Sequence, residues 1–427
     1  MKTIRIGFLG LGTVGQGVWE QLIQKSSVWK QHLDVEIVPE VAAVRNVQKK
    51  RDIDIATERL TTDTDSVVTR TDIDLVIELI GGIEEAKRLT LLAFKHGKSV
   101  ISANKALIAQ HGEELLLAAK EAGVQYFYEA SVAGGIPIIK VIREAFVGNR
   151  IESLQGILNG TSNYILTRME RERISYQEAL KEAKALGYVE QDESLDLDGI
   201  DAAHKVIILA YLCFHQWFPI DKIHAEGIRN ISLKDIKAAE KHGFRIKLIA
   251  TLKELPEVRQ IECSVRPCLV PLSNNLASVN EVYNGVCIQG DIVGTSFLIG
   301  RGAGREPTSS AVLSDIVDFC RNDSQQTLLA CPSNYALSTP DRSLQSYYLR
   351  IEVADVKGVM SDITQALSGN DISISTIDQV LNEAEGSASI MLTTHTCSEE
   401  SIRNVHQIIT NRDYLRNDIV IFPILKS

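Results

Sequence analysis

The sequence lacks the cysteine pattern of a disulfide framework or a zinc site. Its seven cysteines are odd in number and scattered over 427 residues, and no two of them form a C-x-x-C pair. Such usage is typical of reduced, mostly buried thiols in an intracellular compartment. We therefore expect a cytoplasmic protein.

Long apolar runs and an excess of basic charge are also missing. No apolar stretch reaches the roughly 20 residues that a membrane span needs. The start MKTIRIGFLGLG runs directly into a strand pattern rather than through a cleavable leader. The formal net charge of −10 disfavours nucleic-acid binding, which needs a basic surface. We expect neither a membrane nor a nucleic acid as a partner.

A glycine-rich turn stands between a strand pattern and a helix pattern near the start of the chain. Gly10, Gly12 and Gly15 follow the apolar run at residues 4–9 and precede VWEQLIQ. In such a turn the first glycine makes the bend, the second lets a pyrophosphate approach the backbone, and the third lets helix and strand pack closely. The free N–H groups of the helix start then hold the phosphates. This arrangement predicts a dinucleotide-binding unit.

The end of the next expected strand, at residues 36–44, bears on the choice of cofactor. An acidic residue at this point usually binds the ribose hydroxyls of NAD, whereas Arg45 favours the 2′-phosphate of NADP. Lys49, Lys50 and Arg51 either add positive charge or form a solvated basic turn. The sequence thus favours NADP and leaves NAD open.

Two later strand ends carry further candidates. Lys105 follows the strand KSVISA on the same sheet edge as the glycine turn. An amine there can transfer protons beside a nicotinamide, or it can be a surface loop lysine. Glu129 begins the stretch EASVAGGIPI, whose glycines and proline free backbone carbonyls from regular pairing. These oxygens can hold a hard cation, or the stretch can simply bend into the next domain.

The stretch GYVEQDESLDLDGIDAAHK, at residues 187–205, is an acidic loop that leads into an apolar helix. The loop offers the carboxylates of Glu190, Asp192, Glu193, Asp196 and Asp198. We expect Asp198 to cap the helix and Asp201 to lie in its first turn. Asp201 and Lys205 are four residues apart and share one helix face. They form either an intrahelical ion pair or a site that grips a substrate with an ammonium group and a proton-transfer centre.

The length and the succession of patterns predict an α/β protein of about three domains. A second glycine-rich stretch, GRGAGREPT, includes Gly304 and opens a helix, either beside a phosphate or nicotinamide or as a plain turn. The stretch RQIECSVRPCLV alternates like a strand with one wet face. The expected division is a dinucleotide-binding domain at residues 1–136, completed by 300–322, an α+β substrate domain at 137–299, a linker at 323–346, and a ferredoxin-like β-α-β-β-α-β unit at 347–427.

Seven stretches occur in a specific order: GFLGLGTVGQGV, ELIGG, SANK, EASVAGGIPII, ILNGTSNYIL, ALGYVEQDESLDLDGIDAAHK and GRGAGREPTSSAVLSD. Together they resemble the homoserine dehydrogenase family over nearly the whole chain, and the last unit resembles an ACT domain, a small-molecule sensor. The resemblance implies a Rossmann-type domain and the NAD(P)H-dependent reduction of aspartate 4-semialdehyde to homoserine, on the branch leading to threonine and methionine. It also raises an amino-acid effector at the ACT domain.

The resemblance assigns roles by motif position. It implies Lys205 as the general acid/base at the substrate oxygen, with Lys105 close to substrate and nicotinamide. Asp201 would orient or tune Lys205, Glu190 would bind the substrate's ammonium group, and Asp196 would line the pocket. The implied ligands of a monovalent cation such as sodium are Glu129 and the backbone carbonyls of Val132, Gly134 and Ile136. The implied cofactor contacts, besides the three glycines, are Thr13, Val14, Arg45, Lys105 and Gly304.

Two positions depart from the family pattern. The acidic loop usually reads D-P-x-x-D, but here Glu193 stands at the proline position, which predicts a less rigid loop. The first turn of the ACT unit has Lys357-Gly358 where Pro-Gly is common, and this leaves the effector open.

Two other functions remain as alternatives. A 2-hydroxy-acid dehydrogenase with an ACT tail would normally need a histidine held by a carboxylate, and no such pair stands out. A non-catalytic nicotinamide-nucleotide sensor would need an output module, and none is evident. Pairing through the substrate-domain sheet and through the ACT unit suggests a homodimer or homotetramer.

Overall fold

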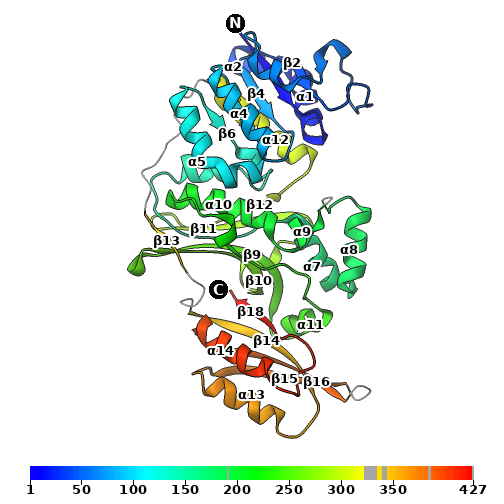
Figure 1. The fold of residues 1–427 in the computed structure, drawn as a ribbon, viewed down its shortest axis with the longest axis vertical. Coiled ribbons are helices and arrows are strands. Elements are labelled where there is room, and N and C mark those ends of the chain that lie inside the picture. Colours follow the sequence, from blue (N-terminus) through cyan, green and yellow to red (C-terminus); the bar gives the residue numbers. More distant parts are fainter. Residues whose placement is uncertain (190–191, 322–333, 339–343, 383–385, 426–427) are drawn as a thin grey trace. The chain divides into compact units, whose positions relative to one another are not determined.

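The computed structural model describes residues 1–189, 192–321, 334–338, 344–382 and 386–425 (Figure 1). The chain divides into two compact units, which we describe separately. The first contains Met1–Glu152, His204–Lys222 and Ile288–Asn334, and the second contains Ser153–Ala203, Ile223–Cys287 and Tyr335–Ser427. The limits of these units differ from the predicted domain boundaries at residues 136 and 299, which stay predictions. Among the described residues no helix is long and apolar enough to cross a membrane.

The first unit is built on a parallel sheet with the strand order β3-β2-β1-β4-β5-β6. Its strands are β1 (Lys2–Leu9), β2 (Val35–Ala43), β3 (Leu60–Thr61), β4 (Leu75–Glu78), β5 (Ser99–Ser102) and β6 (Tyr126–Phe127). The order reverses between β1 and β4, and ligands of doubly wound sheets bind at such a reversal, beyond the carboxyl ends of the strands. This confirms the predicted Rossmann-type unit.

Helices cover the sheet because their apolar stripes match its buried faces. They are α1 (Thr13–Gln24), α2 (Ser26–Leu33), α3 (Thr64–Thr69), α4 (Glu84–Lys95), α5 (Lys105–Glu121), the short α6 (Ile138–Lys140) and α12 (Arg305–Arg321). Trp19 of α1 packs on Phe8 of β1 with ring centroids 5.2 Å apart. Figure 1 shows α12, in yellow, among the blue elements of the chain start, and its Val312 and Ile316 join their core. The chain therefore returns to its first unit at α12.

The rest of the first unit contains less regular segments. A 3-10 turn at Glu129–Ser131 follows β6, and a π-helix at Val141–Ala145 follows α6. Strand β11 (Tyr283–Gly290) begins in the second unit and ends in the first, and β12 (Gly294–Arg301) follows it. The side chain of Thr295 donates to Gln289 across their turn. Short π-helices are frequent at functional sites.

The second unit contains a mainly antiparallel sheet that runs on into the C-terminal domain. Its described order is β7-β9-β10-β18-β14-β16-β15. The strands and helices before the C-terminal domain are β7 (Ile151–Ile157), β8 (His224–Ala225), β9 (Phe244–Leu255), β10 (Gln260–Pro271), β13 (Ala336–Leu337), α7 (Gly160–Glu172), α8 (Tyr176–Ala185), α9 (Glu193–Leu197), α10 (Ile200–Phe214) and α11 (Leu233–Lys241). Helix α10 begins in the second unit and its later residues belong to the first.

One expectation about this sheet is wrong. The sequence predicts one wet face for RQIECSVRPCLV, but β10 is buried on both faces along most of its length. The side chain of Arg266, on the face expected to be wet, pairs with Glu399 of the C-terminal domain at 3.0 Å. The alternation of residue types failed because a second layer covers the polar face.

The C-terminal domain has the predicted β-α-β-β-α-β order, with the two-residue strand β17 added before the second helix. Its elements are β14 (Leu344–Ala354), α13 (Val359–Ser368), β15 (Ile374–Asn382), β16 (Ser387–Thr394), β17 (Cys397–Ser398), α14 (Glu399–Thr410) and β18 (Val420–Ile424). Figure 1 shows α13 and α14 on the same face of its sheet. Leu349, Ile363 and Val405 pack in the core between helices and strands. A parallel bridge between Leu269 of β10 and Ile424 of β18 joins this sheet to that of the substrate domain.

A buried carboxylate fastens the C-terminal domain to helix α11. Asp235 is fully buried and accepts hydrogen bonds from Arg350 Nε at 2.7 Å and Tyr348 Oη at 2.9 Å. Its other oxygen accepts from the backbone N–H of Ser232 at 2.9 Å and so caps α11. One carboxylate thus serves a helix cap and a domain contact.

We expect Asp235→Ala to lower the free energy of unfolding by roughly 3–5 kcal/mol, because the buried Arg350 Nε and Tyr348 Oη lose their common acceptor and Arg350 keeps only its pair with Glu352 at 3.2 Å. Urea unfolding followed by circular dichroism measures the change. Lys241→Ala is the matched control on the same helix: the lysine is exposed, and loss of its pair with Asp378 should cost less than about 1 kcal/mol. Equal effects of the two substitutions would contradict the role of Asp235.

Candidate active site

The three glycines of the first turn have different surroundings. Gly10 has φ +95°, and a Cβ there would lie 2.7 Å from the carbonyl oxygen of Leu79. A Cβ on Gly15 would lie 2.6 Å from the carbonyl oxygen of Gly10, whereas a Cβ on Gly12 would meet nothing within 4 Å. Gly10 and Gly15 are therefore required by the fold itself. Gly12 faces open space at the start of α1, which is where a pyrophosphate would approach.

The start of α1 offers donors for a phosphate. Gly12 is the N-cap residue and supplies no side-chain hydrogen bond, and the first turn contains no acidic residue. The backbone N–H groups of Thr13 and Val14 belong to the first turn, whose N–H groups have no partner within the helix. The positive end of the helix dipole adds to the attraction for an anion. This part of the site fits a dinucleotide.

Arg45 lies just beyond β2, and its side chain is exposed. The loop that follows is held by Arg51, whose guanidinium donates to the backbone oxygens of Asn46 and Lys49, both at 2.9 Å. Gln16 of α1 accepts from the backbone N–H of Asp52 at 2.7 Å and ties the loop to the glycine turn. The side chain of Arg51 therefore stabilises the backbone of the loop. Arg45 is exposed at the sheet edge, where it can meet a ligand.

Helix α12 packs its first turn against α1. Ser309 Oγ donates to the backbone oxygen of Val14 at 3.2 Å, and Arg305 pairs with Glu20 at 2.9 Å. A Cβ on Gly17 would lie 2.5 Å from Ser309 Oγ, so the two helices approach closely. Gly304, with φ +120°, precedes α12. The glycine-rich turn at Gly304 thus leads into α12, which packs against α1, the helix that follows the first glycine-rich turn.

Lys105 is the first residue of α5 rather than a loop residue. Asn104 caps this helix by accepting from the backbone N–H of Leu107 at 3.1 Å, and its amide donates to the backbone oxygen of Gly82 at 2.6 Å. Glu78, fully buried at the end of β4, accepts from Ser102 Oγ at 2.6 Å. Burial raises the pKa of Glu78. These bonds fix Lys105 at the carboxyl edge of the sheet.

Glu129 is buried, and its two carboxylate oxygens accept from the backbone N–H groups of Ile139 at 3.1 Å and Lys140 at 2.9 Å. Burial nevertheless raises the pKa of Glu129 to about 7. Its own backbone N–H donates to Asp315 at 3.0 Å, and burial raises the pKa of Asp315 well above its usual range, with the neighbouring charge of Glu129 adding to the effect. Two buried carboxylates close together favour a bound cation.

The turn between Glu129 and α6 is irregular. Ala133 has φ +51°, and the backbone N–H of Gly135 donates to the backbone oxygen of Arg301 at 2.9 Å. A Cβ on Gly134 would lie 2.9 Å from the backbone oxygen of Gly302, so the turn requires glycine for this close approach. The carbonyls of Val132, Gly134 and Ile136 belong to this turn. The donor set fits a monovalent cation with one carboxylate and several carbonyl oxygens.

On the substrate side, one amide joins two buried carboxylates. Asn159 Nδ2 donates to Asp196 Oδ1 and to Asp201 Oδ2, both at 2.8 Å. Its oxygen accepts from the backbone N–H of Ser162 at 2.7 Å and caps α7. Asp196 and Asp201 are each 3% exposed, so their negative charges lie close together away from water. Carboxylates of this kind can accept hydrogen bonds from an ammonium group.

The acidic loop is anchored differently from what the sequence predicts. Asp192 caps the short helix α9 by accepting from the backbone N–H of Ser194 at 3.0 Å. Asp198 does not cap α10 as expected, because its carboxylate pairs with Arg229 at 2.5 Å. Glu193, at the position of the family's proline, pairs with Lys184 and lies 3.5 Å from Arg229. Glu190 lies outside the described residues.

Helix α10 carries the expected catalytic residues. It begins at Ile200, and Asp201 lies in its first turn, as predicted. Lys205 is buried, and so are the apolar residues that follow it. An amine in this position is shielded from water, which strengthens its electrostatic effect on a nearby oxygen.

Sequence reasoning missed the polar residues that hold the expected ones. Asn159, Glu78 and Asp315 were not singled out, although each binds next to a predicted site residue. Asn159 carried a signal, since an asparagine before Gly-Thr-Ser is typical of a helix N-cap. Glu78 carried another, as an acidic residue inside an apolar strand. Asp315 lies on a long helix and had no local signal.

The chain is similar to known proteins along its whole length. It matches the family models described as "Homoserine dehydrogenase, NAD binding domain" at residues 10–129, "Homoserine dehydrogenase" at 137–317 and "ACT domain" at 347–411. A homoserine dehydrogenase of Synechocystis sp. is 40% identical over 412 residues, which cover 94% of each chain.

Solved structures agree with these matches. The crystal structure of a homoserine dehydrogenase from Thiobacillus denitrificans has a TM-score of 0.90 and 37% identity, and the match covers 100% of this chain and 99% of that one. A hyperthermophilic archaeal homoserine dehydrogenase in complex with NADPH has a TM-score of 0.63 and 26% identity, over 74% of this chain and 97% of that one.

The different surroundings of the glycines allow a paired test of the cofactor site. We expect Gly12→Ala to fold normally and to bind NADPH at least about tenfold more weakly, a loss of ~1.4 kcal/mol or more of binding free energy. The added methyl group meets no protein atom but occupies the space for the pyrophosphate. Quenching of tryptophan fluorescence by NADPH measures the affinity.

Gly15→Ala is the control for the fold. Its Cβ would collide with the backbone oxygen of Gly10, so the free energy of unfolding should fall by roughly 1–3 kcal/mol. If Gly12→Ala lowered the melting temperature as much as Gly15→Ala while NADPH affinity stayed normal, the assignment of the turn would be wrong.

Proposed function

This chain belongs to the homoserine dehydrogenase family, and we propose that it interconverts L-homoserine and L-aspartate 4-semialdehyde with NADP or NAD. The observation that carries the proposal is the buried group on α10 and its neighbours: Lys205 and Asp201 on one helix, with Asp196 joined to Asp201 through Asn159. The open cradle at Gly12 supports a nicotinamide cofactor. The reaction would serve the synthesis of threonine and methionine.

The reaction moves a hydride at the substrate carbon and a proton at the substrate oxygen. The nicotinamide, when bound, supplies or accepts the hydride. We assign the proton transfer to Lys205, whose burial favours a strong interaction with a developing alkoxide. Asp201, one turn before it, would orient the amine. Lys105, fixed at the sheet edge by Asn104, would contact the substrate and the nicotinamide.

The carboxylates of the acidic loop would bind the substrate's ammonium group. We assign this role to Glu190, with Asp196 lining the pocket beside it. Asp196 suits the role because it is buried and held by Asn159. Thr161 Oγ1 donates to the backbone oxygen of Tyr188 at 2.6 Å and thereby anchors the start of the loop on α7.

For the cofactor we favour NADP over NAD. Arg45 is exposed at the end of β2, where it can pair with a 2′-phosphate, and no acidic residue occupies that point of the sequence. The backbone N–H groups of Thr13 and Val14 would hold the pyrophosphate. Gly304, before α12, would contact the cofactor from the second glycine-rich turn.

A monovalent cation, sodium in the first instance, would lie at the turn after Glu129. The raised pKa of Glu129 and the nearby Asp315 favour a positive charge there. The remaining ligands would be the backbone carbonyls of Val132, Gly134 and Ile136. A bound cation would stabilise this turn and with it the start of α6. Among the described residues no group of three or more His, Cys, Asp or Glu side chains is arranged to hold a metal ion.

The C-terminal ACT domain would regulate the enzyme by binding an amino acid. Its continuity with β10 gives it a direct route to the substrate domain. We further propose a homodimer or homotetramer and a location in the cytoplasm. The described cysteines are all free thiols, as expected in a reducing compartment.

We expect the protein to reduce NADP when homoserine is added, seen as a rise in absorbance of the reduced nicotinamide. Lys205→Ala should lower kcat by about 10²–10⁴-fold, because the proton at the substrate oxygen loses its carrier. Its affinity for NADPH should be unchanged. A 2-hydroxy acid in place of homoserine tests the rival dehydrogenase, and no turnover with either substrate would favour the sensor.

Lys222→Ala is a control in the same unit, because Lys222 is 68% exposed and lies outside the site. It should retain wild-type turnover. A Lys205→Ala variant with normal kcat would contradict the assignment of the proton transfer to Lys205.

The proposed cation site predicts a dependence on small monovalent ions. Turnover should fall when sodium and potassium are replaced by tetramethylammonium, because Glu129 and the turn carbonyls lose their common ligand. Glu129→Gln should be less active and should no longer respond to sodium. A wild-type enzyme that works equally well in all three salts would refute the site.

A further inference from the structure

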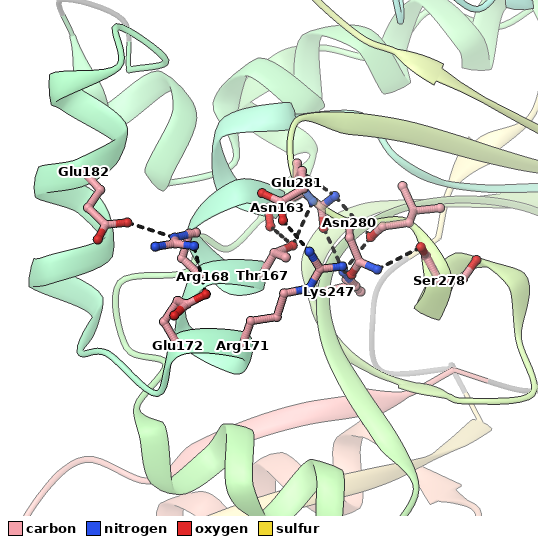
Figure 2. Close-up of polar contacts among 11 residues, drawn as sticks. Asn163, Thr167, Arg168, Arg171, Glu172, Glu182, Lys247, Ser278, Asn280 and Glu281 are labelled. Carbon is pink, nitrogen blue, oxygen red and sulfur yellow. Dashed lines mark hydrogen bonds and ion pairs between the residues drawn. The ribbon is translucent and has the colours of Figure 1, made fainter.

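Lys247 is a fully buried lysine on β9 that no proposed catalytic step uses. Its ammonium donates to Val279 O at 2.6 Å, Asn163 Oδ1 at 3.0 Å and Asn280 Oδ1 at 3.1 Å. Figure 2 shows the side chain pointing between Asn163 and Asn280. A lysine ammonium has three N–H donors, and here each has an acceptor. The ammonium group of Lys247 is thus bound by three uncharged oxygen atoms.

The charged groups around Lys247 are paired with one another. Arg245 binds Glu170 at 2.7 Å, and Arg171 binds Glu281 at 2.6 Å. Burial lowers the pKa of Lys247 to about 7. Burying this charge costs free energy that an apolar side chain of similar size would not require. The stability of the fold therefore does not explain why a lysine occupies this position. Its three directed hydrogen bonds do fix the relative positions of the groups that accept them.

The geometry that Lys247 fixes is the turn at residues 279–283. Asn163 holds the same turn by donating to the backbone oxygens of Val279, Glu281 and Tyr283, at 3.2, 3.0 and 3.1 Å. Glu281 has φ +56°, a conformation that a non-glycine residue rarely adopts without support. Lys247 and Asn163 thus fasten a strained turn to β9 and to α7.

The fastened turn supports the start of α7. A Cβ on Gly160 would lie 2.8 Å from the backbone oxygen of Val282, so the first residue of α7 rests directly on the turn. The residue before it is Asn159, whose amide holds Asp196 and Asp201. A continuous set of contacts therefore leads from Lys247, through the turn and Gly160, to the two carboxylates.

We propose that Lys247 is a positioning residue: its buried ammonium fixes the turn at 279–283 and the start of α7, and thereby sets the relative positions of Asp196 and Asp201 for the substrate. This inference rests on the proposed function of these two aspartates. It extends the functional machinery to a strand and a turn that contact no reacting atom.

Lys247→Met tests the proposal, because methionine keeps the length of the side chain and removes the three donors. We expect kcat/KM for homoserine to fall roughly 100-fold, the effect of a displacement of about 1 Å in a reacting group. The affinity for NADPH should be unchanged, since the glycine turn is untouched. Amide hydrogen exchange at residues 193–201 should become faster, and this readout does not require activity.

Lys253→Met is the matched control, because Lys253 lies on the same strand with an exposed side chain. It should alter neither turnover nor exchange. If Lys247→Met does not fold, Asn280→Ala removes one of the three acceptors and should give a smaller loss in the same two readouts. The side chain of Asn280 accepts from Lys247 and donates to the backbone oxygen of Ser278, and neither bond involves Asp196 or Asp201.

The outcomes separate the two proposals. A wild-type protein without homoserine turnover refutes the proposed function, and the exchange experiment still decides on Lys247. A folded Lys247→Met variant with normal exchange at residues 193–201 overturns the inference, as does one with normal kcat/KM in an active enzyme. Equal losses of NADPH affinity and of homoserine turnover would show a general structural defect and would also overturn it.

Discussion

The substrate side of this protein depends on a single amide that holds two buried carboxylates. Asp196 and Asp201 carry like charges in a region closed to water, and Asn159 gives one N–H to each at 2.8 Å. Two such carboxylates repel each other, and the repulsion is strong where few water molecules screen it. The amide offsets part of it without adding charge.

The same amide couples the helix to the loop. Because the oxygen of Asn159 caps α7, its nitrogen can point only toward the carboxylates. The start of α7 is thus fixed relative to both α9 and α10. Asn159 therefore contributes to the position of Asp196 at the end of the acidic loop. The ion pairs of Glu193 are exposed and contribute little stability, so they do not replace the proline of the family pattern.

The sequence was sufficient for the architecture because the relevant signals are local. The glycine turn, the apolar strands and the β-α-β-β-α-β order of the C-terminal domain are each indicated by short stretches of sequence, and the structure agrees with them. The errors have a common cause in contacts between distant segments. Asp198 pairs with Arg229 instead of capping a helix, and β10 is covered by residues more than 100 positions away, such as Glu399. Neither partner is visible from the local pattern.

The candidate site was predicted in the same uneven way. Residues that follow strands or start helices, such as Lys105 and Asp201, could be found from their positions. The residues that hold them in place, such as Glu78 and Asp315, could not be found in this way, because no local motif indicates which residue each of them contacts. The sequence suggested that Asn159 caps α7, but not that its amide nitrogen also binds Asp196 and Asp201. Sequence reasoning thus identifies groups that meet a ligand more readily than groups that hold them.

Two of the buried charges in this protein fix irregular backbone. Glu129 accepts from two N–H groups at the start of α6, and Lys247 donates to an oxygen of the 279–283 turn. Irregular turns leave backbone groups without partners from regular structure, and such groups are costly when buried. A charged side chain of the right sign satisfies them and selects one conformation of the turn. A chain with the same strands and glycines but apolar residues at positions 129 and 247 could therefore still form both sheets. It would lack the defined turns on which the proposed cation and substrate sites depend.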